Sequence, residues 1–122
     1  MFSDTVLDHF QNPRNAGELE GATAVVEVSN PVCGDVLRLA VVMECGVVRE
    51  ARFLCRGCTA SIASGSLLTE MMQGKTRSEL NELTAEEIAA GLGGLLPASF
   101  HAAQLAQDAA RAVASMLPAT RG

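Results

Sequence analysis

The order of hydrophobic patterns along this 122-residue chain predicts an α+β fold. Runs rich in β-branched residues come first, over 24–28, 36–43 and 47–54, and patterns with helical spacing follow residue 58. Strands that precede helices in this way are typical of a small sheet with helices packed on one face. We therefore expect a three-stranded antiparallel sheet, one face covered by helices, and a long C-terminal helix.

A short amphipathic helix is expected before the sheet. Asp4 can cap its N-terminus, and the proline and glycine of residues 12–17 end it. Its apolar stripe would consist of Val6, Leu7 and Phe10. The first element is thus predicted to be a small helix that packs on the rest of the fold.

Turn residues and helix signals place the remaining elements. Turns at Asn30-Pro31 and at 44–46 separate the three strands, which predicts an antiparallel meander. A 3.6-residue period predicts a helix over 59–73. Thr84-Ala85-Glu86-Glu87 matches a capping box and predicts a short helix that ends at Gly91. An alanine-rich helix then runs from Pro97 to about Leu117.

Composition and charge narrow the expected partners and location. The formal net charge is −5 and no Lys/Arg cluster is present, so nucleic acid is not an expected partner, because its affinity comes largely from basic patches. The first residues lack a signal-peptide pattern, and no apolar run approaches the roughly 20 residues of a membrane helix. We expect a single domain over residues 1–122 in the cytoplasm, with no membrane partner.

The four cysteines are the first candidates for chemistry. In a reducing cytosol, Cys33, Cys45, Cys55 and Cys58 are expected to be ligands, reactive thiols or core residues rather than disulfides. Cys33 and Asp35 flank a glycine in the turn before the second strand, so both side chains can face one cation. The same turn chemistry also occurs for structural reasons alone.

The segment Cys55-Arg56-Gly57-Cys58 connects the end of the third predicted strand to the start of a predicted helix. The positive end of the helix dipole and Arg56 favour the thiolate form of Cys58. This setting suits a thiolate ligand and a redox Cys-x-x-Cys pair equally well. Cys55 shares the strand face of Phe53, so a place in the core is an equal alternative for it.

Two histidines complete the candidate donors. His101 lies early in the last helix, where a histidine by itself is more often a surface residue than a ligand. His9 has no cysteine near it in sequence and is left outside the predicted site.

Three ordered motifs resemble the IscU/NifU iron-sulfur scaffold family. They are Asp8-His9-Phe10 with Asn12-Pro13-Arg14-Asn15, then Asn30-Pro31-Val32-Cys33-Gly34-Asp35, and Gly57-Cys58 with Ala60 and Ala63-Ser64. The resemblance covers nearly the whole chain and agrees with the family's small α+β fold. It implies a non-enzymatic scaffold that receives sulfur from a cysteine desulfurase, assembles a [2Fe-2S] cluster and passes it to acceptor proteins.

The resemblance also implies a set of ligands, from which this chain departs at one position. The family's final helix begins with His followed by Cys, whereas this chain has His101 followed by Ala102. The implied donors are therefore Cys33, Asp35, Cys58 and His101. A carboxylate among thiolates binds iron weakly, which suits a cargo that must be released.

Three interpretations of the missing cysteine remain open at this stage. Cys55 substitutes for it, or His101 or a second subunit of a homodimer completes the site, or the site holds a single zinc ion, which these donors would also suit. Sulfur cannot be accepted directly at residue 102. The family's chaperone-recognition segment, Leu-Pro-Pro-Val-Lys, is replaced by 95–99 here, so chaperone-assisted release is not expected.

The leading hypothesis is thus a scaffold or carrier for iron or a [2Fe-2S] cluster. One alternative is a zinc-binding thiol or sulfur transferase that acts through Cys58 with Cys55 as resolving thiol. The other is a degenerate member of the family that binds partners and whose metal site is vestigial.

Overall fold

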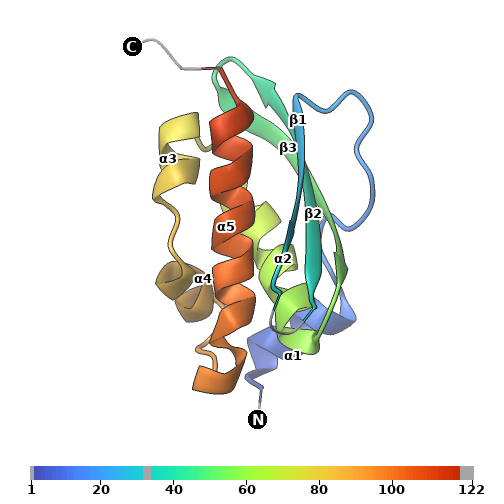
Figure 1. Cartoon of the computed structure of the whole chain (residues 1–122), viewed down its shortest axis with the longest axis vertical. Coiled ribbons are helices and arrows are strands. Elements are labelled where there is room, and N and C mark those ends of the chain that lie inside the picture. The colour runs from blue at the N-terminus through green and yellow to red at the C-terminus, as the bar shows by residue number, and fades with distance from the viewer. Residues whose placement is uncertain (1, 32–33, 119–122) are drawn as a thin grey trace.

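The computed structural model describes residues 2–31 and 34–118 (Figure 1). Within them the elements are α1 (Asp4–Gln11), β1 (Ala24–Ser29), β2 (Val36–Glu44), β3 (Val47–Arg56), α2 (Thr59–Met72), α3 (Arg77–Glu82), α4 (Ala85–Gly91), the 3-10 turn η1 (Pro97–Ser99) and α5 (Phe100–Met116). The predicted α+β class and the long C-terminal helix are confirmed.

The three strands form the predicted antiparallel meander in the order β1-β2-β3. The turn between β2 and β3 consists of Cys45 and Gly46, whose φ angles are 54° and 80°. Two consecutive residues with positive φ fit the tight two-residue turn that matches the twist of a hairpin. Cys45 therefore lies at the far end of β2 from Asp35, which directly precedes this strand.

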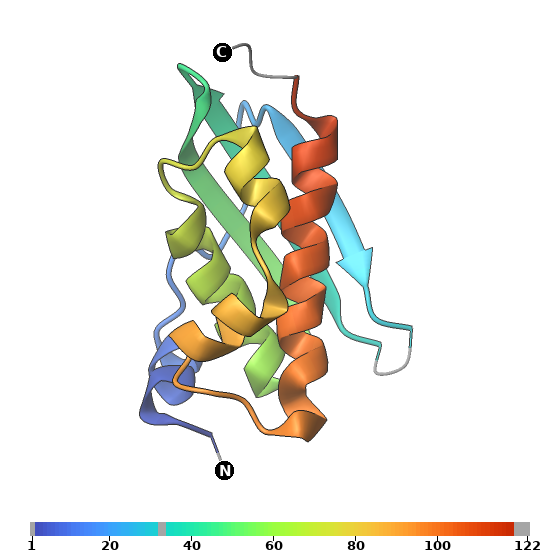
Figure 2. The ribbon, with the colours of Figure 1, turned by 90° about the vertical axis from the view of Figure 1, so that its left-hand side faces the viewer.

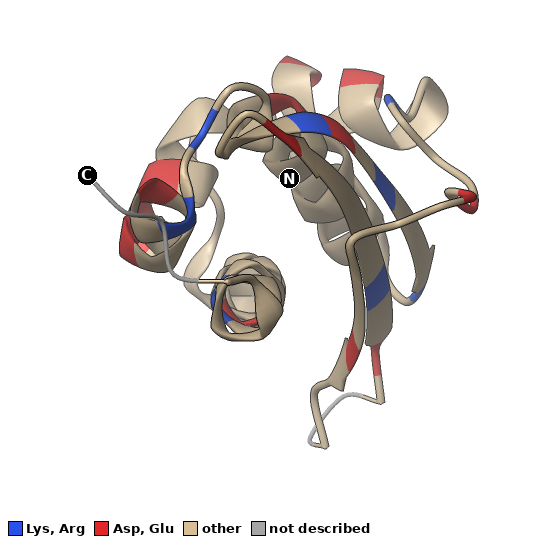
Figure 3. Ribbon diagram, turned by 90° about the horizontal axis from the view of Figure 1, so that it is seen from above, with Lys and Arg blue, Asp and Glu red and all other residues tan. Residues whose placement is uncertain are grey.

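Helices cover one face of the sheet, as expected. α5 packs on β1 and β2, and α2 packs on β3 and α5, while α3 and α4 lie against α5 on the side away from the sheet (Figure 2). Seen from above, α5 is nearly end-on beside the curved sheet (Figure 3). On the opposite face of the sheet, Val25 and Leu54 are exposed.

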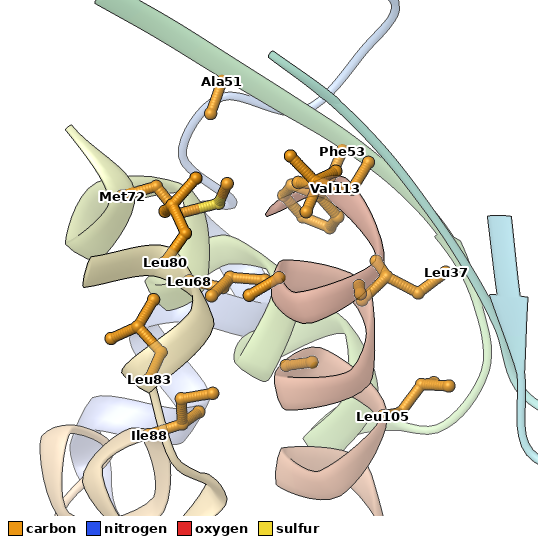
Figure 4. Close-up of a cluster of buried hydrophobic side chains, with 14 of the residues drawn as sticks. Leu37, Ala51, Phe53, Leu68, Met72, Leu80, Leu83, Ile88, Leu105 and Val113 are labelled. Carbon is orange, nitrogen blue, oxygen red and sulfur yellow. The ribbon is translucent and has the colours of Figure 1, made fainter. Parts of the chain in front are cut away.

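The core lies between the sheet and these helices (Figure 4). Leu37 and Phe53 extend from the sheet, Leu68 from α2, and Leu105 and Val113 from α5, and each is at most 3% exposed. Their contact removes apolar surface from water, which is the main favourable contribution to folding. This packing fixes where the first turns of α2 and α5 lie relative to β2.

The N-terminal helix forms, but its cap and its buried face differ from the prediction. Ser3, not Asp4, caps α1 by accepting a hydrogen bond from the backbone N–H of Val6 at 3.1 Å. Leu7 and Phe10 are each 38% exposed, while Val6 and His9 are buried. The predicted apolar stripe is confirmed for Val6 and wrong for Leu7 and Phe10, because His9 and not these two residues lies buried beside Val6 and contacts α2.

The helix α3 was not predicted from the sequence. Thr76 and Glu79 form a reciprocal capping box, with hydrogen bonds of 3.2 Å and 3.0 Å. Only Leu80 is buried along this six-residue helix, so it has no apolar period to detect. At the start of α4, Thr84 accepts from the Glu87 N–H as predicted, but the Glu87 carboxylate then accepts from the Thr84 hydroxyl.

No helix among the described residues combines the length and the apolar character needed to cross a membrane.

Candidate functional site

Three segments that are distant in sequence meet at one end of the fold. Asp35 lies just before β2, Cys58 is the N-cap of α2, and His101 is in the first turn of α5. One carboxylate oxygen, the Sγ atom and one ring nitrogen lie within 4.8 Å of one another. Among the described residues, three of the four predicted donors therefore converge. The fourth, Cys33, lies outside the described residues, and its role as a ligand stays a prediction.

The ring of His101 is oriented by the turn before it. Its Nδ1 lies 3.1 Å from the carbonyl oxygen of Ala98, and this oxygen is a hydrogen-bond acceptor only. Nδ1 must then carry the proton in the neutral ring, so the lone pair is on Nε2. Nε2 lies 3.8 Å from Oδ2 of Asp35. This is the arrangement in which a histidine presents Nε2 to a metal ion.

The carboxylate of Asp35 is buried, and its side chain is 9% exposed. Its Oδ2 accepts a hydrogen bond of 2.5 Å from the Ser61 hydroxyl and a longer one of 3.5 Å from the backbone N–H of Cys58. These bonds offset the cost of removing a carboxylate from water. The backbone is fixed as well, because the carbonyl of Asp35 accepts from the N–H of Asn30 at 2.9 Å.

Gly57 makes room for this carboxylate. A Cβ atom at position 57 would lie 2.7 Å from Cγ of Asp35 and 3.0 Å from its Oδ1. Real Cβ atoms essentially never come as close as 2.7 Å to a non-bonded atom, so any other residue would displace the Asp35 side chain. Sequence reasoning treated this glycine only as part of the motif before Cys58, and it did not single out Ser61.

Cys58 is the exposed donor of the group. As the N-cap of α2 it lies at the positive end of the helix dipole, where a bound anion is favoured. Its Sγ atom lies 3.4 Å from the Ser61 hydroxyl. Solvent therefore reaches the site through Cys58 and through the ring of His101, which is 30% exposed.

Cys55 does not belong to the group that converges here. It pairs with Leu37 across the sheet, packs against the core and is partly buried. Burial, and then the negative charges of Asp35 and Cys58, raise the pKa of its thiol to about 12. Cys55 is outside the group of donors that converges among the described residues, which gives no support to its substitution for the missing ligand. Ala102 is 1% exposed and buried in the fold.

His9 and Cys45 lie outside the site, as the sequence indicated. His9 is 5% exposed, and its Nδ1 is hydrogen-bonded to the Ser66 hydroxyl at 2.7 Å. Cys45 is exposed in the hairpin turn between β2 and β3.

Known proteins resemble this chain over most of its length. The chain is 44% identical over 111 residues to the iron-sulfur cluster assembly scaffold protein IscU 1 of Archaeoglobus fulgidus, covering 91% of this chain and 72% of the relative. It is 43% identical over 115 residues to the scaffold protein IscU of Azotobacter vinelandii, covering 91% of this chain and 89% of the relative.

Solved structures share the fold. A NifU-like N-terminal protein from Brucella abortus superposes with a TM-score of 0.76 at 20% identity, over 93% of this chain and 92% of that one. A scaffold protein of the SUF system from Fervidobacterium islandicum gives 0.76 at 21%, over 93% and 96%. The family model described as the NifU-like N terminal domain matches residues 1–121 of the sequence. The chain belongs to this family, as its motifs indicated.

Proposed function

We propose that this protein is a scaffold on which an iron-sulfur cluster is assembled and from which it passes to acceptor proteins. The observation that carries the proposal is the convergence of Asp35, Cys58 and His101 within 4.8 Å at an open end of the fold. The scaffold relatives, which match nearly the whole chain at about 40% identity, support the same assignment.

The proposed ligands differ in the strength with which they hold iron. Cys58 offers a soft thiolate, as would Cys33, and His101 offers an imidazole nitrogen. Asp35 offers a hard oxygen that competes poorly with thiolate in a cluster. The cargo, a [2Fe-2S] cluster or iron, would therefore be held firmly on one side and weakly on the other, which suits release.

The proposed partners follow from this role. A scaffold needs a source of sulfur, which we propose is a cysteine desulfurase, and acceptor proteins of iron-sulfur type. Because residue 102 is a buried alanine, sulfur delivery to that position is not part of the proposal. The protein itself makes or breaks no bond in a substrate other than those to its cargo, so we propose that it is not an enzyme.

Anaerobic reconstitution of the whole chain with ferrous iron and sulfide tests the proposal. The parent protein is expected to bind both and to show the visible absorbance of a cluster. Cys58→Ala and Cys33→Ala are each expected to lose most of it, whereas Cys45→Ala, which changes a thiol at the far end of β2, is the matched control. Equal cluster content in the parent and in both ligand variants would refute the assignment.

A zinc site is the second candidate, because one sulfur, one nitrogen and one oxygen donor within reach suit a tetrahedral zinc ion. The metal and sulfide content of the anaerobically purified protein distinguishes the zinc site from the cluster scaffold. Zinc at one equivalent without sulfide, which iron and sulfide do not displace, would favour the zinc site. A thiol transferase that relies on Cys55 has less support, because the raised pKa keeps that thiol protonated.

A further inference from the structure

The Ser61 hydroxyl touches two of the proposed ligands at once. It lies 2.5 Å from Oδ2 of Asp35 and 3.4 Å from Sγ of Cys58. We propose that Ser61 is a positioning residue that holds the Asp35 carboxylate beside the Cys58 sulfur, so that both face the same metal. This inference rests on the proposed function and adds to it the residue that sets the geometry of the weak ligand.

The position of Ser61 follows from the helix. Residues three apart on an α-helix lie on the same face, and Ser61 is three residues after Cys58 in the first turn of α2. Its side chain points inward, with 1% of the residue exposed, so water does not compete for the hydroxyl. Burying the Ser61 hydroxyl lowers stability less than burying an unpaired hydroxyl would, because its hydrogen is donated to the carboxylate.

The hydroxyl can serve both contacts with its single hydrogen. It donates this hydrogen to Asp35, and in the metal-free protein its oxygen can then accept from the Cys58 thiol. When Cys58 binds a metal as a thiolate, the donation to Asp35 is the contact that stays. The carboxylate is thus held at Oδ2 by Ser61, and the missing Cβ of Gly57 leaves it the space that it occupies there. Without the hydroxyl, Asp35 loses its hydrogen bond of 2.5 Å from Ser61, and we expect its carboxylate to turn away from His101.

Ser64 provides a matched control on the same helix. It is fully buried, and its Oγ is the one buried side-chain oxygen or nitrogen of the described residues that lacks a hydrogen-bond partner. Ser64→Ala therefore removes the same atom from the same helix without touching the site. Any effect common to Ser61→Ala and Ser64→Ala comes from the helix, and any difference comes from Asp35 and Cys58.

The test is a titration of the whole chain with Co²⁺ under anaerobic conditions, followed by the sulfur-to-cobalt charge-transfer band and the d–d bands. Loss of a partner that orients a metal ligand typically weakens binding by about 10–100-fold. We expect a weakening of this size and shifted d–d bands for Ser61→Ala, and parent behaviour for Ser64→Ala. In an Asp35→Ala background, Ser61→Ala is expected to have no further effect.

The outcomes separate this inference from the proposed function. If the parent binds Co²⁺ through Cys58 and Ser61→Ala binds it equally well, the inference is overturned and the scaffold proposal stands. An equal loss with and without Asp35 would also overturn it, because Ser61 would then act through the helix. A parent that binds no Co²⁺ would overturn the inference, whereas the scaffold proposal is judged by its own reconstitution with iron and sulfide.

A second pair of variants keeps the test valid if Ser61→Ala does not fold. Ser61→Thr and Ser61→Val add nearly the same volume, but only threonine keeps the hydroxyl. Ser61→Thr is expected to bind Co²⁺ about 10–100-fold more tightly than Ser61→Val. Equal affinities of this pair would overturn the inference.

Discussion

Ser61 and Ser66 of α2 each contact a buried polar side chain, and only Ser61 does so within the candidate metal site. Ser66 contacts Nδ1 of His9 at 2.7 Å and accepts from the backbone N–H of Arg14 at 2.9 Å. Ser61 contacts Asp35 and Cys58. The first cluster is enclosed between α1 and α2, whereas the second opens to solvent through Cys58.

The difference shows what distinguishes a site from a structural contact in this fold. The Nδ1 of His9 is held by Ser66 and its Nε2 lies 3.6 Å from Glu70, and among the described residues His9 belongs to no group of three metal donors. His101 uses only Nδ1 for its local hydrogen bond and presents Nε2 to two further donors. A site therefore needs donors whose remaining lone pairs point to a common space, and burial alone does not provide this.

The largest expected effect is the difference in alkylation rate between the exposed thiols and the partly buried Cys55. It tests whether only one end of this region is open to solvent. A pKa near 12 in place of the usual 9 leaves Cys55 with about 1,000-fold less thiolate than an ordinary cysteine near neutral pH. We expect iodoacetamide to label Cys58 and the exposed Cys45 long before Cys55, as peptide mass spectrometry after timed labelling would show. If Cys55 were labelled as fast as Cys45, its thiol would be accessible to the reagent, and the expected burial would be contradicted.

The two histidines offer the next test, because replacing His101 is expected to change metal affinity and replacing His9 is expected to change stability. His101→Ala removes a proposed ligand and is expected to weaken Co²⁺ binding by more than about 100-fold, since even an outer partner is worth 10–100-fold. His9→Ala is expected to leave that affinity unchanged. Instead it should lower the free energy of unfolding by about 2–3 kcal/mol, because it opens a cavity and leaves Ser66 without its partner.

Denaturant unfolding and Co²⁺ titration of both variants check this pair. If His9→Ala loses affinity while its unfolding is unchanged, the enclosed cluster belongs to the site after all, and the distinction fails.

Ser66→Ala is expected to have a smaller effect than His9→Ala, and again on stability alone. It leaves one buried ring nitrogen and the N–H of Arg14 without their partner, which typically costs about 1–3 kcal/mol. Ser64→Ala, which removes a hydroxyl that has no partner among the described residues, is expected to be neutral or stabilising. Urea unfolding compares the two variants, and a larger loss for Ser64→Ala would contradict the hydrogen-bond account.

Most of the fold could be predicted because its signals are local. The alternation of β-branched runs and turn residues placed β1, β2 and β3 within two residues of their ends, and the period of α2 and the composition of α5 were equally clear. The helix α3 was missed because a single buried leucine gives no period. The buried face of α1 was predicted correctly for Val6 only, because its other buried residue is a histidine, which no apolar pattern reveals.

The site could be predicted only in part, because its donors are motif residues and its supports are not. Asp35, Cys58 and His101 follow from the family's motifs. The roles of Ser61 and Gly57 depend on where α2 meets the segment before β2, which is a property of tertiary packing. The one available signal was the spacing of Ser61, three residues after Cys58 on a helix, which places both on one face.

The smallest expected effect is a dependence of the free energy of unfolding on pH, which arises from the buried His9. Burial, together with the charge of Arg14, lowers the pKa of His9 below the usual 6.5, against the opposing effects of Glu70 and Asp8. The unfolded chain therefore binds this proton at higher pH than the folded one. The stabilisation is complete above pH 6.5 and is lost as the pH falls toward the folded pKa, with a slope of at most about 1.4 kcal/mol per unit. Urea unfolding from pH 7.5 to 5 should show this slope in the parent and in His101→Gln but not in His9→Gln, and a slope that persists in His9→Gln would assign the effect to another group.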